Sequence, residues 1–330
     1  MTDFTWKDAE RVVIFRSGAL ENAPALLREH GWEQFDVLST ARALKGAPRE
    51  LEAVGSVHEV PPGAVPQAAK SIMGTVRGIA TVALGGGRVI DTAKAIAAVH
   101  GGRVCAVPTT LSGAPMTAIH RLPDGHDAPR LVRPALVLAD PEAMTSLPEE
   151  GLRASAMNAL AHGAESLYTP LANPVAEMAA TRGAALIARA LDRDRARRDR
   201  GELALGAILC GYAVDSAGFA LHHVLGQTIV RVCGTPHAET YAALLPRTME
   251  AMRERAPVAI GSLAEALGTE PERIGERIEA LGGRRRLGEL GADPECRAEV
   301  IEVATKRPEL GRTPDPPAPD ELGAILDAAW

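Results

Sequence analysis

The sequence predicts an α/β protein in two parts: a Rossmann-like parallel sheet covered by helices over residues 1–148, and an all-helical part over 149–330. Two observations predict this division. Up to about residue 140, short β-branched or apolar runs alternate with segments of helical spacing, which is typical of a parallel sheet covered by helices. After Pro148 the segments are rich in Ala, Leu and Arg and contain few β-branched runs, which favours helices.

Each element is predicted from its local pattern. Strands are expected at 11–15, 35–38, 80–84, 104–107 and 135–138. Helices are expected at 22–30, 65–76, 152–168, 174–191, 203–230 and 320–330. The Arg-rich stretch 192–201 is predicted as a turn, and 312–317 contains too many prolines to be helical.

Composition narrows the class of partner. The chain has 330 residues, of which 46% are hydrophobic and 24% charged, so it can bury two cores. A net charge of -6 without a long basic block argues against nucleic acid or a membrane surface as partner, and favours a small-molecule substrate. Residues 1–11 are charged where a secretory signal would be apolar, and no apolar run approaches the ~20 residues of a membrane span. We therefore expect a cytoplasmic protein.

The four cysteines, Cys105, Cys210, Cys233 and Cys296, lie far apart in the sequence and form no CxxC pair. This spacing suggests neither a disulfide framework nor a zinc–thiolate site. All four are expected to be buried, unreactive thiols.

A glycine run follows the predicted strand 80–84. Gly85, Gly86 and Gly87 lead directly into a segment of helical spacing that begins at Arg88. Glycines let backbone N–H groups approach a ligand, and the start of a helix offers free donors and a favourable dipole for phosphate. A glycine run alone is more often a tight turn without a ligand.

A second loop strengthens the ligand interpretation. Pro108, Thr109 and Thr110 end the next predicted strand. In an open parallel sheet, ligands bind outside the carboxyl ends of the strands, so the two loops should lie side by side. Hydroxyl groups on one loop could then bind phosphate or ribose held by the other.

The residues of these loops resemble a known family. The segment 85–94, Gly-Gly-Gly-Arg-Val-Ile-Asp-Thr-Ala-Lys, resembles the GGGSxxDxAK motif of the iron-containing (group III) alcohol dehydrogenases, and 108–110 resembles their PTT segment. The likeness continues through 155–165 and 221–246 to the C-terminus. It implies a dehydroquinate synthase-like fold, an active-site cleft between two domains, and NAD or NADP as cofactor. The implied cofactor-binding residues are Gly85, Gly86, Gly87, Asp91, Lys94, Thr109 and Thr110, with Ser112, Thr117 and Thr40 beside them.

Within this superfamily, 157–159 and 236–240 are most similar to the maleylacetate reductases, as is the opening segment 11–20. Relatives commonly form homodimers through the N-terminal strand. Residues 12–15 could supply such a strand, although an internal edge strand explains them equally well.

The resemblance also implies that the metal site has been lost. Metal-dependent members use one Asp and three His. Here Asn158 and His162 stand for the Asp and the first His, Phe219 stands for the second His, and His237 for the third. Two neutral imidazoles without a carboxylate fall short of a catalytic zinc site, and an Asn oxygen is a poor substitute for carboxylate. No metal is expected, and maleylacetate reductases share the Asn.

Acid–base chemistry would remain. The resemblance brings His162, His223 and His237 together at the cleft as catalytic residues, and an imidazole with a pKa near ~6.5 can give a proton to a carbonyl oxygen. His222 should point about 100° away from His223 on a helix, which favours a packing role.

Several residues depart from the family pattern. Ala114 and Pro115 replace a Ser-Glu pair, and 219–221 replaces a His-His-Lys of the maleylacetate reductases. A family lysine has no clear counterpart, with Arg130 only a guess. The second strand ends without the Asp that would exclude NADP, and Arg42 could attract a 2′-phosphate.

Three hypotheses follow. The first is a metal-independent NAD(P)H-dependent reductase of a carbonyl or enol substrate. The second is a redox-neutral biosynthetic enzyme, a cyclase or isomerase, that reuses the scaffold with an apolar pocket around Phe219 and Pro115. The third is an inactive homologue with a binding or regulatory role.

Overall fold

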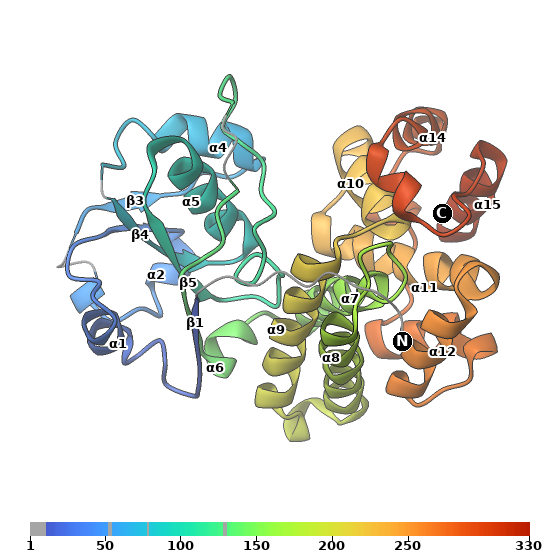
Figure 1. The fold of residues 1–330 in the computed structure, drawn as a ribbon, viewed down its shortest axis with the longest axis horizontal. Coiled ribbons are helices and arrows are strands. Elements are labelled where there is room, and N and C mark those ends of the chain that lie inside the picture. The colour runs from blue at the N-terminus through green and yellow to red at the C-terminus, as the bar shows by residue number, and fades with distance from the viewer. Residues whose placement is uncertain (1–10, 52–54, 78, 128–130) are drawn as a thin grey trace. The chain divides into compact units, whose positions relative to one another are not determined.

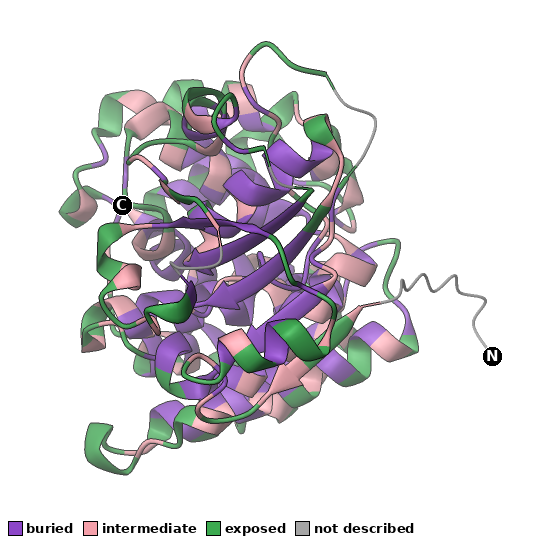
Figure 2. Cartoon of the chain, turned by 90° about the vertical axis from the view of Figure 1, so that its left-hand side faces the viewer, coloured by how far each residue is buried: buried purple, intermediate pink, exposed green. Residues whose placement is uncertain are grey.

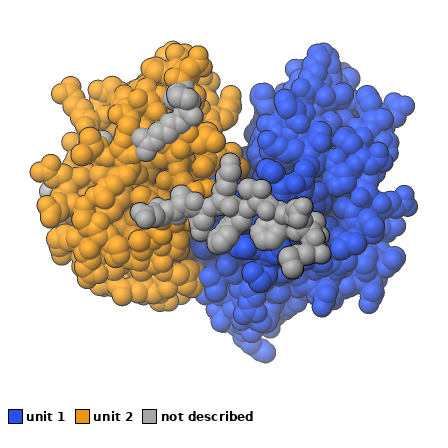
Figure 3. Space-filling model, viewed as in Figure 1, with its two compact units in different colours: residues 1–8, 148–330 blue, residues 9–147 orange. Residues whose placement is uncertain are grey.

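The computed structural model describes residues 11–51, 55–77, 79–127 and 131–330, which fall into two compact units, 11–147 and 148–330 (Figures 1 and 3). The predictions for the N-terminal segment before residue 11 and for Arg130 lie outside the described residues.

The first unit contains a six-stranded, all-parallel sheet in the order β1-β6-β5-β4-β2-β3 (Figure 1). The five predicted strands are confirmed to within a residue or two at each end. A sixth, β3, was not predicted, because this three-residue strand lies at the sheet edge and has no apolar run. The strands are β1 (Val12–Phe15), β2 (Asp36–Ser39), β3 (Val57–Glu59), β4 (Ala80–Gly85), β5 (Arg103–Pro108) and β6 (Leu136–Ala139).

Alternate residues of the strands enter two separate cores. Val37 and Val82 pack on one face with α1 (Ala23–Glu29), whereas Leu38 and Ala83 pack on the other with α4 (Val65–Ile72) and α5 (Gly87–His100). This period of two is the geometry of a pleated strand. With both faces covered, the central strands β2, β4, β5 and β6 are almost entirely buried, whereas the edge strands β1 and β3 are partly exposed (Figure 2). Two four-residue helices, α2 (Ala41–Leu44) and α6 (Pro141–Met144), complete the unit.

The second unit is helical, as the sequence predicts, and the helices at 152–168, 174–191 and 320–330 are confirmed with small shifts at their ends. Short 3-10 turns connect several of the helices, and one of them, Pro308–Arg312, precedes the non-helical proline-rich segment. The α-helices are α7 (Glu149–Ser166), α8 (Pro174–Asp192), α9 (Arg200–Ala217), α10 (Leu221–Cys233), α11 (His237–Arg255), α12 (Pro257–Leu267), α13 (Ile274–Gly282), α14 (Arg297–Thr305) and α15 (Pro319–Ala329).

The single helix predicted over 203–230 is wrong. The chain forms α9 and α10, which are bent by 101° relative to one another. The break follows from Gly218, whose φ of +76° is favourable only for glycine and ends α9. Within the described ranges, no single helix is long and apolar enough to cross a membrane, and α9 with α10 meets that test only as a bent pair.

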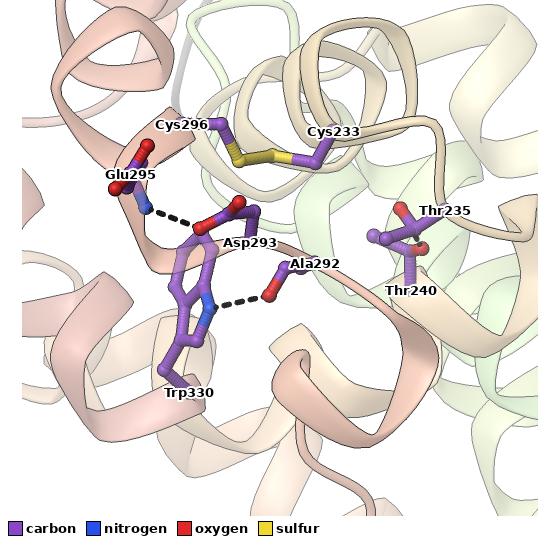
Figure 4. The surroundings of a disulfide bond; sticks show 8 residues. All are labelled: Cys233, Thr235, Thr240, Ala292, Asp293, Glu295, Cys296 and Trp330. Atoms are coloured by element: carbon purple, nitrogen blue, oxygen red, sulfur yellow. Dashed lines mark hydrogen bonds between the residues drawn. A yellow bond between two sulfur atoms is a disulfide. The ribbon is translucent and has the colours of Figure 1, made fainter.

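The prediction of four free cysteines is also wrong. Cys233 at the end of α10 and Cys296 before α14 form a disulfide with a Cα–Cα distance of 6.0 Å (Figure 4). Their sequence separation of 63 hides the pairing, because only the packing of α14 beside α10 brings them together. Cys105 and Cys210 are free and buried, as expected.

Candidate functional site

The glycine loop and the threonine loop are neighbours in the sheet unit. Gly85 pairs in register with Pro108 at the carboxyl ends of β4 and β5, and the Thr109 N–H donates to the Gly85 carbonyl at 3.0 Å. A Cβ on Gly86 would lie 3.0 Å from Thr110 Cγ2, and one on Gly87 would lie 3.1 Å from Ser112 Oγ. Glycine therefore lets the two loops approach closely, since a side chain at either position would require Thr110 or Ser112 to shift by a few tenths of an ångström. The adjacency predicted from the sequence is confirmed.

Lys94 holds residues 114–119, which follow the threonine loop, by hydrogen bonds. Its ammonium group is fully buried on α5 and donates to the carbonyl oxygens of Ala114 at 3.1 Å, Thr117 at 3.0 Å and Ile119 at 2.8 Å. Asp91, one turn earlier, holds the same nitrogen at 2.7 Å. These contacts use the hydrogens of the ammonium within the protein. The lysine thereby shapes the loop beside the glycines.

The remaining predicted cofactor residues lie around the same sheet edge. Thr40 follows β2 and accepts from the Ala43 N–H at 3.3 Å, which caps α2. Thr117 is buried, with its hydroxyl 3.4 Å from Lys94 Nζ. The Ser112 hydroxyl oxygen is buried and has no hydrogen-bond partner among the described residues. Because β2 is the neighbour of β4, these side chains flank the glycine loop from both sides.

The helical unit gathers the predicted catalytic histidines. His162 comes from α7 and His223 from α10, and their rings stack with centroids 4.9 Å apart. His237 begins α11, and Tyr241 bridges it to His223 with centroid distances of 4.4 Å and 5.1 Å. The three histidines therefore belong to one cluster. His222 is fully buried and its Nδ1 lies 3.0 Å from the Thr248 hydroxyl, which agrees with a packing role.

Two features hold the start of α11 and with it His237. The disulfide anchors Cys233, at the end of α10. Two residues later, Thr235 accepts a hydrogen bond from the Thr240 hydroxyl at 2.7 Å (Figure 4). A residue at the first position of a helix takes its direction from the preceding loop, so these contacts set where His237 stands.

Glu165 is the residue of this cluster to which the sequence analysis assigned no role. Its side chain is fully buried on α7, and its carboxylate bonds to Nδ1 of His223. The same carboxylate receives backbone N–H groups at the start of α10, including that of His222 at 2.7 Å. Asn158, His162 and Glu165 are spaced four and three residues apart, which places them on one helical face, and this spacing is the signal that could have identified Glu165.

Burial makes most of these rings poor bases. The pKa of His162 is lowered well below its ordinary value, first by burial and then by the His223 and His237 rings. The pKa of His222 is lowered by the same causes, again with burial first. Both rings are therefore neutral at neutral pH.

Several buried polar atoms in the cluster have no hydrogen-bond partner among the described residues. They are Asn158 Oδ1, His162 Nδ1, His222 Nε2 and His223 Nε2. Buried polar groups are nearly always paired, and an unpaired one costs about 1–3 kcal/mol. Water or a bound molecule would have to supply the missing partners.

The donors do not fit the metal that the resemblance would imply. Asn158 offers a neutral oxygen, and the ring of Phe219, 5.4 Å from that of His223, offers no ligand atom. Within the part of the chain that the structure describes, no three His, Cys, Asp or Glu side chains are grouped so that they could hold a metal ion. The residues present therefore do not fit that metal.

Comparison with known proteins supports the resemblance. Residues 14–143 match the model "Iron-containing alcohol dehydrogenase", and 153–330 match "Fe-containing alcohol dehydrogenase family, C-terminal". Maleylacetate reductase 2 of Cupriavidus pinatubonensis is 34% identical over 82% of this chain and 80% of its own, and the maleylacetate reductase of Burkholderia cepacia is 31% identical over 96% and 95%.

A solved structure agrees with the sequence relatives. The crystal structure of maleylacetate reductase from Agrobacterium tumefaciens superposes with a TM-score of 0.89 at 28% identity, covering 100% of this chain and 99% of that one. Both the sheet unit and the helical unit are thus accounted for by one fold. The chain belongs to the iron-containing alcohol dehydrogenase family, a family of oxidoreductases.

Proposed function

We propose that this protein is a reductase that uses NADH or NADPH to reduce a carbonyl or enol substrate without a catalytic metal. The observation that carries the proposal is His223: a buried imidazole whose Nδ1 is bonded to a carboxylate and whose Nε2 has no partner among the described residues. It stands in a cluster that retains His162 and His237 but has Asn158 and Phe219 at the other two metal-ligand positions.

The sheet unit supports dinucleotide binding. The first turn of α5 and the glycines before it would hold the pyrophosphate, with Thr109, Thr110 and Ser112 supplying hydroxyl groups. Lys94 would act on the dinucleotide through the 114–119 segment, because its ammonium is occupied by carbonyl oxygens. Arg42 follows β2 without a neighbouring Asp at the strand end, so both NADH and NADPH are to be tested.

The helical unit supports proton transfer. When bound, a reduced nicotinamide supplies the hydride. His223 would give its Nε2 proton to the substrate oxygen while the adjacent carbon accepts that hydride, leaving a hydroxyl group and a neutral imidazole. His162 is kept neutral by its lowered pKa, so it would orient substrate and not donate the proton. His237, which begins α11, is the alternative donor. Burial and then the His223 ring lower its pKa to about 4, which makes it the weaker proton donor at neutral pH.

The dinucleotide part of the proposal has a direct test. The unfolding temperature is measured with and without millimolar NADH or NADPH, for the wild type, Gly86→Ala and Gly74→Ala. Ligand binding should stabilise the wild type and Gly74→Ala, because a methyl group at Gly74 meets nothing within 4 Å. The methyl group of Gly86→Ala pushes against Thr110 and should weaken binding about 10-fold or more. No stabilisation of the wild type by either dinucleotide would overturn the proposal.

The catalytic part is tested by turnover. Maleylacetate, which the relatives' names specify, is the first substrate to try, and related keto acids and simple ketones follow. NAD(P)H oxidation should continue after dialysis against a strong chelator. A rate that disappears with the chelator and returns with Fe²⁺ or Zn²⁺ would contradict metal independence.

One observation favours a second candidate, the redox-neutral enzyme. Phe219 packs against His223 and makes that side of the cluster apolar. If a substrate is converted equally fast after the dinucleotide has been removed, the protein is a cyclase or isomerase. If His223→Ala and His237→Ala change no measurable conversion, a binding or regulatory role is supported.

We also propose a homodimer. β1 is an edge strand of the sheet, and the exposed fractions of Val12 and Val13 are 44% and 37%. Pairing of two such edges would cover these side chains. Light scattering on the eluting protein distinguishes a dimer from a monomer, and Val13→Lys should shift a dimer toward monomer.

A further inference from the structure

We infer that Glu165 is a positioning residue: it fixes the proton of His223 on Nδ1 and thereby keeps Nε2 directed at the reacting molecule. This inference deepens the proposed function and rests on it, since it concerns the proton donor of that reaction. The geometry that carries it is the convergence of α7 and α10 on one carboxylate.

The hydrogen-bond pattern is that of an ionised carboxylate. Oε1 accepts from the backbone N–H groups of Ala220 at 3.1 Å and His222 at 2.7 Å, and from the Tyr168 hydroxyl at 3.1 Å. Oε2 accepts from the His223 N–H at 3.3 Å. Backbone N–H groups can only donate, and each carboxylate oxygen receives at least one of them, which is the pattern that an ionised carboxylate satisfies.

The charge of Glu165 affects the pKa values of two neighbouring tyrosines. It helps to raise the pKa of Tyr168 and of Tyr241, after burial in both cases. Both tyrosines therefore stay neutral at neutral pH. The negative charge beside the imidazole is that of Glu165.

The bond from Glu165 dictates the tautomer of His223. An ionised carboxylate can only accept, so Nδ1 must carry a hydrogen. The other nitrogen, Nε2, is buried and has no partner among the described residues. With Nδ1 satisfied by the protein, any further proton that His223 takes or gives passes through Nε2.

A purely structural role for Glu165 is the competing explanation. Ala220, the residue before α10, makes no side-chain cap, and Glu165 from another helix supplies that cap instead. The two roles use different oxygens for the most part: Oε1 serves the helix start, and Oε2 faces the imidazole. A substitution that preserves one oxygen and replaces the other can therefore separate them.

Glu165→Gln is that substitution. Its amide oxygen can still accept the N–H groups of Ala220 and His222, while its NH₂ group faces His223 Nδ1. Because NH₂ only donates, Nδ1 must become the acceptor and the hydrogen must move to Nε2. Tyr168→Phe is the matched control, since it removes one donor to Glu165 without touching His223.

The experiment is ¹⁵N NMR of histidine-labelled full-length protein, with His223→Gln to assign the ring. Nδ1 of His223 should be protonated in the wild type and in Tyr168→Phe, and unprotonated in Glu165→Gln. Unfolding temperatures should agree within a few degrees. In turnover, Glu165→Gln should lower kcat about 100-fold or more with KM changed less than about 3-fold, whereas Tyr168→Phe stays within about 3-fold of the wild type.

The outcomes separate this inference from the proposed function. If Nδ1 keeps its proton in a folded Glu165→Gln protein, or if kcat is unchanged there, Glu165 only caps the helix and the inference is wrong while the reductase stands. If the tautomer switches but no substrate is reduced by the wild type, Glu165 positions His223 as inferred and the proposed function fails. Because the NMR measurement needs no substrate, it tests the role of Glu165 whether or not a substrate is found.

Discussion

The surroundings of Lys94 in the sheet unit and the histidine cluster of the helical unit treat buried polar groups in opposite ways. In the first, Lys94 is fully buried and its ammonium is shared among three carbonyl oxygens and Asp91. In the second, His162 and His223 each leave a ring nitrogen without a partner among the described residues. A polar group whose hydrogen bonds are satisfied within the protein serves as scaffold. One without a partner, such as these rings or the Ser112 hydroxyl beside the glycine loop, needs a water molecule or a ligand to complete its hydrogen bonds.

The largest effect should come from removing the hydrogen bonds of the Lys94 ammonium. Lys94→Met keeps the length of the side chain but leaves three carbonyl oxygens and Asp91 without their cation. We expect the free energy of unfolding of the sheet unit to fall by about 4 kcal/mol. Urea unfolding measures it, with the exposed Lys70→Met as control. A loss below about 1 kcal/mol would show that the loop is held by other contacts.

The next largest effect on stability should come from the disulfide that anchors the end of α10, beside the histidine cluster. Cys296→Ser removes the disulfide that closes a separation of 63 residues. A more open unfolded chain should lower the stability of the helical unit by about 3 kcal/mol. Cys210→Ser, at a free buried thiol, is the control for loss of a sulfur atom. Equal stability with and without a reducing agent would mean that the bond does not form in solution.

Restoring the missing ligands of the histidine cluster should create a metal site. Asn158→Asp with Phe219→His restores the carboxylate and the second imidazole that the family's metal site requires. Binding of Zn²⁺, followed by calorimetry, should become about 100-fold tighter than in the wild type, which corresponds to about 2.7 kcal/mol. Either single variant serves as control. A wild type that already binds as tightly as the double variant would refute the loss of the site.

The smallest effect concerns the beginning of α7, the helix that carries Asn158, His162 and Glu165. Arg198 and then Arg153 lower the pKa of Glu149 to about 2 from an ordinary 4.5. A lowered pKa in the folded state stabilises the fold above pH 4.5, and this contribution is lost as the pH falls toward 2. Allowing for solvent screening, we expect about 2 kcal/mol.

The variant Glu149→Gln tests this contribution. It should be less stable than the wild type at pH 7 and should lose less stability between pH 4.5 and 2. Glu302→Gln, at an exposed pair with Lys306, is the matched control. Parallel stability curves of wild type and Glu149→Gln against pH would contradict the assignment.

The sequence by itself determined the features that depend on neighbours along the chain. Short β-branched or apolar runs predicted five of the six strands. Gly85 to Gly87 followed by Pro108 to Thr110 predicted the adjacent loops, because a parallel sheet sets its strand ends side by side. The identities of Asn158 and Phe219 were sufficient to question a metal, since ligand chemistry depends on residue type.

Features that depend on residues distant in the sequence became evident only from the tertiary structure. Cys233 and Cys296 pair because α14 packs beside α10, and α10 leaves the line of α9 because the left-handed Gly218 ends that helix. Glu165 acquires its partners 55 to 58 residues away, on a helix whose start it caps. Hydrogen bonds and disulfides require contact within a few ångströms, and no local pattern encodes which distant segment will supply it.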